Sequence, residues 1–213
     1  HDHAIRTKAE IMVDHFHEQV FQLNKVGGEA RAMVVTSGIE RAIQYYHAIR
    51  DYLVEIKSPY QAIVAFSGEH EYGGVKVTET SLNGFPSSAI ADRIVEDPYR
   101  FLVCADKFQT GYDEPLMHTM YVDKVLSGIK AVQTLSRLNR IHPLKEDTFV
   151  LDFVNDRDEL REAFKTYYEG AEMGAEVDPA RMYQVKGELD ASGIYLAEEV
   201  ERFCAVYFKP KQR

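Results

Sequence analysis

The sequence predicts an α/β fold in which helices cover both faces of a parallel sheet. Three observations support this prediction. Short, nearly continuous apolar runs of strand length alternate with amphipathic segments of helical periodicity, which is the pattern of strands buried on both faces. Gly- and Pro-containing breaks separate these segments. No apolar run approaches the roughly 20 residues that span a bilayer.

Each predicted element has a local reason in the sequence. Helices are predicted where apolar residues recur at spacings of three and four, and strands where runs are apolar and rich in β-branched residues. Gly27-Gly28 ends the first helix and Ser58-Pro59 the second. The predicted elements are, in order, a helix at 4–25, a strand at 31–37, a helix at 39–57, a strand at 62–68, an excursion with a short hairpin at 69–86, a short helix at 87–96, strands at 99–106 and 118–123, a helix at 128–140 and a strand at 148–154.

The character of the chain changes after about residue 157, where two helical segments are joined by a Gly- and Pro-containing stretch. The predicted organisation is therefore an N-terminal helix at 1–27, a main α/β domain at 28–156 and a C-terminal helical extension at 157–213. We find no internal repeats and no low-complexity tracts.

Composition excludes several classes of protein. The net charge of −9 argues against nucleic-acid binding by bulk charge, although it permits a local basic groove. The two cysteines form no CxxC pair, and Cys104 lies in an apolar run, which predicts a buried thiol in a reduced cytoplasm. The first residues lack the basic and apolar regions of a signal peptide. We expect a cytoplasmic protein with no membrane contact and no metal site, because its histidines lack zincin spacing.

Polar residues follow the predicted strands. In parallel α/β sheets, ligands bind beyond the carboxyl ends of the strands. The residues expected there are Thr36, Ser37, Ser67, Gly68, Asp106, Asp123, Lys124 and Asp152.

The stretch QTLSRLNRIHP, residues 133–143, places Gln133, Arg137 and Arg140 on one face of the predicted helix. Leu135, Leu138 and Ile141 fall on other faces, which suits packing on the sheet. Forked guanidinium groups suit phosphate oxygens and the charge that builds during phosphoryl transfer. A solvated basic face is the alternative that spacing alone leaves open.

The loop after the third predicted strand, CADKFQTGYDEP at 104–115, carries Thr110, Gly111 and Asp113. Glycine lets the backbone approach a phosphate or sugar closely, and the carboxylate can hold a ribose hydroxyl or order an arginine. A polar loop in which Asp and Thr only form turns is the alternative interpretation.

Taken in order, these stretches resemble the C-terminal half of a superfamily 2 helicase motor, which is RecA-like. Gly111-x-Asp113 resembles helicase motif V, Gln133-x-x-x-Arg137-x-x-Arg140 resembles motif VI, and RAMVVTS at 31–37 corresponds to motif IV. The closer resemblance is to the second motor domain of the R subunit of type I restriction enzymes. It is carried by VAFSGE, SLNGFP, ADKFQTGYDEPLMHTMYVDK and AVQTLSRLNRIHP.

The resemblance implies a role for each of these residues. Arg140 and Arg137 would reach the γ-phosphate of ATP held with Mg²⁺ by the first motor domain, and Gln133 would set that geometry. Gly111 and Asp113 would lie near the nucleotide. The residues implied to lie near the DNA backbone are Thr36, Ser37, Ser67, Lys107 and Thr110. Many helicases have arginine where Thr110 stands, which puts a direct nucleotide contact from that position in doubt.

The resemblance also implies partners that this sequence does not contain. No G-x-x-x-x-G-K-[ST] phosphate loop occurs, and Asp113-Glu114 does not follow an apolar strand as a magnesium-binding box would. We therefore expect this chain to be half of a motor, which by itself neither hydrolyses ATP nor cuts DNA. Its implied partners are double-stranded DNA, a first motor domain and a nuclease domain of the same polypeptide, and methyltransferase and specificity subunits. The alternatives are another superfamily 2 translocase or a stand-alone α/β binding domain.

Overall fold

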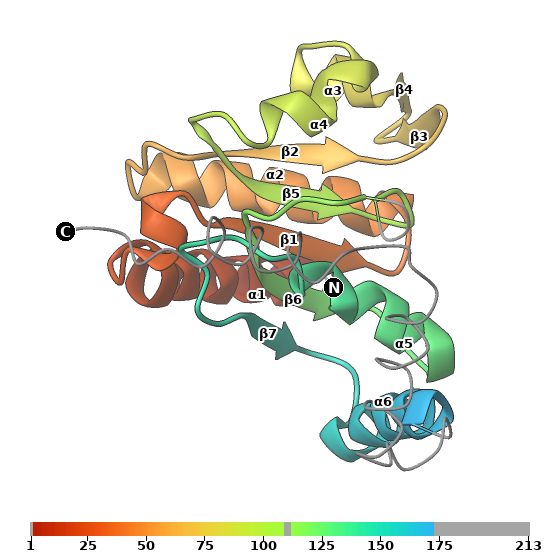
Figure 1. Ribbon diagram of the computed structural model, residues 1–213. Helices are drawn as coiled ribbons and strands as arrows, with labels where there is room; N and C mark the ends of the chain where they lie inside the picture. The colour runs from red at the N-terminus through yellow and green to blue at the C-terminus, as the bar shows by residue number, and fades with distance from the viewer. Residues whose placement is uncertain (1, 109–111, 173–213) are drawn as a thin grey trace, which may run out of the picture. The chain divides into compact units, whose positions relative to one another are not determined.

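A five-stranded parallel sheet forms the centre of the molecule (Figure 1). The structure, a computed structural model, describes residues 2–108 and 112–172. The strand order is β2-β5-β1-β6-β7 and every pairing is parallel. The strands are β1 (Arg31–Thr36), β2 (Gln61–Ala65), β5 (Tyr99–Cys104), β6 (Met117–Asp123) and β7 (Phe149–Asp152). The predicted α/β class is confirmed, and all five strands were predicted to within a few residues.

Successive residues of each strand face two separate cores, because side chains alternate along a strand. In β1, Ala32 and Val34 join the core under α1 (Asp2–His15) and α2 (Ile39–Glu55). Met33 and Val35 join the second core, with α4 (Ile90–Arg93), α5 (Gly128–Leu135) and the first turns of α6 (Arg157–Glu172). Every residue of β1 is therefore buried, as expected of a central strand covered on both faces.

The first predicted helix changes geometry part of the way along. After α1 the chain forms a π-helix at Phe16–Phe21 and then a 3₁₀ turn at Lys25–Gly28. A π turn contains more residues than an α turn, so the apolar stripe loses its 3.6-residue register. Phe16 and Val20 remain buried, whereas Leu23 is 57% exposed. The expectation that Leu23 continues the buried stripe is wrong for this reason.

The predicted excursion at 69–86 is an insert beside β2. It contains the antiparallel hairpin of β3 (His70–Tyr72) and β4 (Val75–Val77), followed by α3 (Glu79–Asn83). Thr78 caps α3 through a reciprocal pair of hydrogen bonds with Ser81. A 3₁₀ turn at Ser87–Ala89 then leads into α4, so the helix predicted at 87–96 is shorter than expected.

The free edge of β2 is occupied by a side chain from α3. The Asn83 amide accepts a hydrogen bond from Val64 N–H at 2.9 Å and donates one to Val64 C=O at 2.8 Å. One side chain thereby makes the two bonds that a neighbouring strand would make at that residue. Figure 1 shows α3 next to β2 on this side of the sheet.

A buried arginine joins two segments, the chain before β1 and the chain between α4 and β5. The Arg31 side chain is 2% exposed. Its Nε donates to Ile94 C=O at 2.7 Å, its Nη2 to Val95 C=O at 2.8 Å, and its Nη1 to Glu29 C=O. Burial, followed by the neighbouring charge of Arg100, lowers the pKa of Arg31 to about 10. The guanidinium is therefore charged at neutral pH and satisfied mainly by backbone carbonyls.

A buried histidine, His118, and a half-buried one, His15, lie near the amino ends of β6 and β7. His118 Nε2 lies 2.8 Å from Asp147 Oδ1, and Lys25 Nζ donates to the other oxygen of Asp147 at 2.5 Å. The His15 ring stacks on Phe149 with 4.2 Å between centroids. Burial lowers the pKa of both histidines, and at His118 the hydrogen bond to Asp147 opposes that effect.

We expect acid to destabilise the fold between about pH 7 and pH 5. The charges facing His118 are Asp147, Lys25 and Lys145, and those facing His15 are Glu18 and His118. Because the pKa of each histidine is lower in the folded state, the unfolded chain binds more protons below about pH 6.5, and the free energy of unfolding falls as the pH is lowered. Each histidine contributes at most about 1.4 kcal/mol per pH unit.

Urea unfolding measured across this range tests the expectation. His118→Gln keeps polar groups at this position but cannot titrate, so it should flatten the pH dependence. His15 and His47, whose pKa values burial also lowers, leave a residual slope in that variant. Stability that is constant or rises on acidification would contradict the assignment.

The chain divides into two compact units, residues 1–167 and 168–213. The sheet and both cores belong to the first unit. The predicted C-terminal extension begins as expected with a helix, α6, and residues 173–213 lie outside the described part of the chain. The boundary predicted at residue 157 stays a prediction.

Candidate functional site

The carboxyl ends of the strands meet at one edge of the sheet. Thr36, the last residue of β1, is in register with Asp123, the last of β6. Val35 is in register with Cys104, which ends β5. The polar residues that follow these strands are therefore brought to the same edge, as the sequence predicts.

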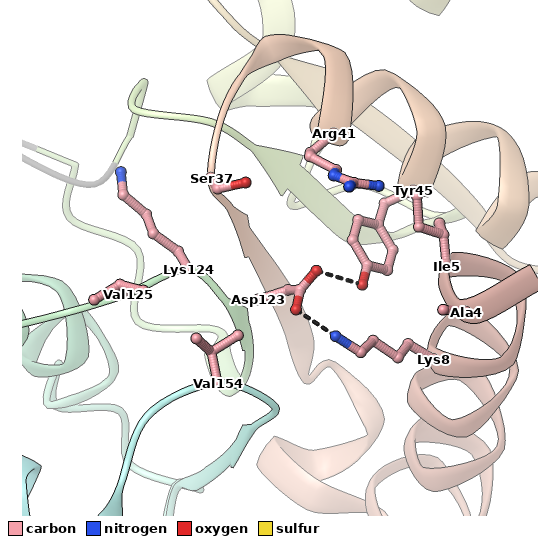
Figure 2. A pocket seen from close by; sticks show the side chains of 10 residues that line it. All are labelled: Ala4, Ile5, Lys8, Ser37, Arg41, Tyr45, Asp123, Lys124, Val125 and Val154. Atoms are coloured by element: carbon pink, nitrogen blue, oxygen red, sulfur yellow. Dashed lines mark hydrogen bonds and ion pairs between the residues drawn. The ribbon is translucent and has the colours of Figure 1, made fainter. Parts of the chain in front are cut away.

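A pocket of about 360 Å³ opens at this edge (Figure 2). Ser37 after β1 and Asp123 at the end of β6 contribute to its wall, as expected for strand-end residues. Three cationic side chains also line it: Lys8 from α1, Arg41 from α2 and Lys124 after β6. Two of these cations are already paired with carboxylates, Lys8 with Asp123 and Lys124 with Asp106, each at 2.6 Å.

Asp123 fixes the wall of this pocket. Its carboxylate accepts from Lys8 Nζ at 2.6 Å and from the Tyr45 hydroxyl at 2.7 Å, and Figure 2 shows both bonds converging on it. The side chain is only 14% exposed. Burial, reinforced by the hydrogen bond to Asp123, raises the pKa of Tyr45, so the phenol stays neutral and donates. The carboxylate has both oxygens engaged and serves as a structural anchor of the pocket.

Sequence reasoning missed Lys8, Arg41 and Tyr45. They lie on α1 and α2, whose periodicity predicted only packing on the sheet. No local signal marks these three positions as part of a pocket, because the sheet topology alone brings the two helices beside the end of β6.

Both arginines of the 133–143 stretch contact the loop between β5 and β6. Arg137 Nη1 donates to Tyr112 C=O at 2.9 Å. Arg140 Nε lies 3.0 Å from Asp113 Oδ1, forming an ion pair between side chains that are 40% and 68% exposed. The Nε hydrogen is not aligned for a hydrogen bond, so charge rather than geometry holds this pair. The structure therefore joins two segments that the sequence singles out separately.

Arg140 does not lie on the helix predicted at 128–140. The α-helix ends at Leu135, a 3₁₀ turn covers Ser136–Leu138, and Asn139 has a ψ of 34°. Arg140 therefore lies beyond the helix and shares no helical face with Gln133. Ile141 was expected to pack on the sheet, but it is 95% exposed for the same reason, whereas Leu138 is buried as expected.

A lysine holds the backbone where the helix ends. Lys145 Nζ donates to Leu138 C=O at 2.9 Å and to Arg140 C=O at 3.0 Å. Carbonyls at a helix end lack partners within the helix, and a cation satisfies them well. Burial lowers the pKa of Lys145. This lysine fixes the backbone from which the Arg140 side chain extends.

Gln133 lies apart from the arginine contacts with the loop. It is exposed and lines a second pocket, of about 370 Å³, at the start of α5. Asp106, Lys124 and Lys130 line the same pocket, and Lys124 Nζ donates to Asp106 at 2.6 Å. The pocket contains two of the predicted strand-end residues and adds Lys130 to them.

The residues implied to lie near DNA have different environments. Ser37 and Ser67 are exposed beyond their strands. The side chain of Thr36 is fully buried, and its single hydroxyl hydrogen lies between two acceptors, Gly38 C=O at 3.1 Å and Cys104 C=O at 3.2 Å. This burial is incompatible with a DNA contact by that hydroxyl. Lys107 donates to Glu79. Thr110 and Gly111 lie outside the described residues.

Cys104 is buried, as predicted, and burial raises the pKa of its thiol to about 12. A protonated, buried thiol is a poor nucleophile. Among residues 2–108 and 112–172, no three acidic, histidine or cysteine side chains are grouped so as to hold a metal ion. Within those same ranges, no helix has the length and apolar character needed to cross a membrane.

Comparison with known proteins relates this chain to one group of enzymes. Residues 75–155 match the family model "T1R_D3-like: Type I restriction enzyme subunit R domain 3". The chain is 29% identical over 110 residues to the type I restriction enzyme HindI endonuclease subunit of Haemophilus influenzae, an alignment that covers 49% of this chain and 10% of that protein. It is 36% identical over 72 residues, or 34% of this chain and 7% of the relative, to the candidate type I endonuclease subunit MjaVIIP of Methanocaldococcus jannaschii.

A solved structure has a similar fold. A fragment of a candidate HsdR subunit of a type I restriction enzyme from Vibrio vulnificus YJ016 superposes with a TM-score of 0.52. The identity is 15%, and the match covers 71% of this chain and 28% of that one. The aligned parts span a tenth or less of the curated relatives.

Proposed function

We propose that this chain, a relative of the R subunits of type I restriction enzymes, is the second motor domain of an ATP-dependent translocase acting on double-stranded DNA. One observation carries the proposal: Arg137 and Arg140 both contact the loop after β5, through Tyr112 C=O and Asp113. Two guanidinium groups are thereby presented beside a strand-end loop, where they suit the charge of a transferring phosphoryl group.

The ion pair between Arg140 and Asp113 suits a group that must change partners. Both side chains are well exposed, and exposed ion pairs contribute only about 0–1 kcal/mol. Arg140 can therefore leave Asp113 for a phosphate oxygen at little cost. Arg137 donates to the backbone carbonyl of Tyr112. This bond keeps residues 137–140 beside the loop while Arg140 changes partners.

The nucleotide itself would be held by another domain. The sequence contains no phosphate-binding P-loop, so ATP with Mg²⁺ would be bound by a first motor domain of the same polypeptide. Closure of the two domains would bring Arg140 to the γ-phosphate. The DNA backbone would lie along the carboxyl edge of the sheet, where Lys8, Arg41 and Lys124 line a pocket. Nuclease, methyltransferase and specificity functions would come from other domains and subunits of a restriction system.

The test is ATP hydrolysis measured with and without duplex DNA. We expect the complete R subunit that carries this chain to hydrolyse ATP in a DNA-dependent way, and residues 1–213 alone to hydrolyse none. Adding DNA to residues 1–213 serves as the matched control. Hydrolysis by residues 1–213 alone, or none by the complete subunit, would contradict the proposal.

A further inference from the structure

Glu79 is a buried carboxylate beside β2 that the proposed chemistry does not use. It is the first residue of α3 and is 3% exposed. The cap of α3 is formed by Thr78 and Ser81, so capping does not explain it. Glu79 Oε1 accepts from Phe66 N–H at 2.6 Å, and its two oxygens lie 2.8 and 2.7 Å from Lys107 Nζ.

Burial makes this contact hard to break. A buried carboxylate is strongly disfavoured unless it is paired and hydrogen-bonded. Lys107 is the cation paired with Glu79 in the described part of the chain, and its side chain is 28% exposed. Lys107 stands three residues after β5, on the loop that leads to Tyr112 and Asp113. The buried carboxylate thus fixes the near end of that loop.

A series of contacts continues from Lys107 along the loop. The Lys107 ammonium lies 5.4 Å from the centroid of the Phe108 ring. Phe108 has a φ of +66°, a conformation that non-glycine residues rarely adopt without support from their surroundings. Its ring meets the Tyr112 ring edge to face, with 4.7 Å between centroids. Tyr112 C=O then accepts from Arg137.

We propose that Glu79 is a positioning residue for the arginine-bearing site. It holds Lys107, and Lys107 and Phe108 set the position at which Tyr112 and Asp113 meet Arg137 and Arg140. Glu79 touches neither nucleotide nor DNA in this proposal and acts only through the loop. The inference rests on the proposed function, because its readout is ATP turnover.

Glu79→Gln in the complete R subunit tests the proposal. Glutamine keeps the shape and the acceptor for Phe66 N–H but removes the charge that holds Lys107. We expect kcat for DNA-stimulated ATP hydrolysis to fall roughly 10- to 100-fold with KM for ATP nearly unchanged, since misplacement of a reacting group reduces turnover rather than binding.

Glu69→Gln is the matched control, because Glu69 pairs with Lys76 at 2.7 Å with both side chains exposed. It should leave kcat unchanged. A folded Glu79→Gln protein with kcat within about twofold of wild type would overturn the inference. If Glu79→Gln does not fold, Phe108→Ala replaces it, because it removes the ring that lies between Lys107 and Tyr112. The same fall in kcat is expected, and an unchanged kcat again refutes the inference. If the wild-type subunit shows DNA-dependent turnover and Glu79→Gln has the same kcat, only this inference is rejected. If the wild-type subunit shows no turnover, the proposed function is rejected.

Discussion

Replacing Arg140 with alanine is expected to lower DNA-stimulated ATP turnover by about 10³–10⁵-fold, the range attributed to arginine fingers. Among the described residues, the guanidinium is held beside the loop after β5 by an ion pair with Asp113, whose side chain is 68% exposed. Alanine removes the positive charge where negative charge builds in the transition state. ATP affinity should change little, because another domain is proposed to hold the nucleotide. Steady-state hydrolysis and equilibrium binding of ATP to the complete R subunit measure the two quantities.

Arg161→Ala supplies the control for that experiment. Arg161 is 67% exposed on α6 and lies 3.7 Å from Asp158, so its loss should alter neither turnover nor affinity. Unchanged DNA-stimulated turnover in Arg140→Ala would refute the finger assignment. A loss of ATP affinity equal to the loss of turnover would instead indicate that Arg140 binds the nucleotide in the ground state.

Replacing Arg31 with methionine is expected to lower the free energy of unfolding by roughly 3–5 kcal/mol. Methionine fills much of the same volume but donates no hydrogen bond. The carbonyls of Ile94, Val95 and Glu29 would lose the donors they have now, in a place that solvent barely reaches. These carbonyls belong to the chain before β1 and the chain after α4, so their connection at the amino edge of the sheet would be lost.

Urea unfolding of residues 1–213 measures this loss. Arg93→Met is a suitable comparison, because Arg93 pairs with Glu96 at 3.3 Å with both side chains about half exposed. That variant should lie within about 0.5 kcal/mol of wild type. Equal stabilities for Arg31→Met and Arg93→Met would show that the carbonyl contacts of Arg31 do not stabilise the fold.

The strands could be predicted because buried strands have continuous apolar sequences. β1 is buried along its whole length, and a strand covered on both faces has to be apolar throughout. Once the strands are parallel, the meeting of Ser37, Asp106 and Asp123 at one edge follows from topology. That part of the site needed no knowledge of side-chain conformations.

The ends of helices were predicted less well. The residues after Leu135 continue a helical pattern, yet the chain tightens into a 3₁₀ turn and leaves the helix at Asn139. Lys145 donates to the carbonyls of Leu138 and Arg140 and so stabilises the end of the helix at this point. This tertiary contact cannot be predicted from the spacing of apolar residues. The predicted burial of Leu23 is wrong for a similar reason, because the spacing of apolar residues does not reveal a π-helix.

Contacts between distant segments were not predictable at all. Asp123 meets Lys8 and Tyr45 from two different helices, and Glu79 meets Lys107 from another strand connection. In the sequence these residues look like ordinary charged or core-edge positions. Their pairing depends on the strand order and on how the insert after β2 folds back, which a single sequence does not specify.

The Asn83 side chain has a consequence for self-association. An unpaired strand edge is a template onto which another chain can add a strand. At β2 the N–H and C=O of Val64, the fourth of the five residues of the strand, are already bound by this amide. A foreign strand would have to displace it to grow the sheet in this direction. Extension of the sheet by a second chain is therefore disfavoured at this edge.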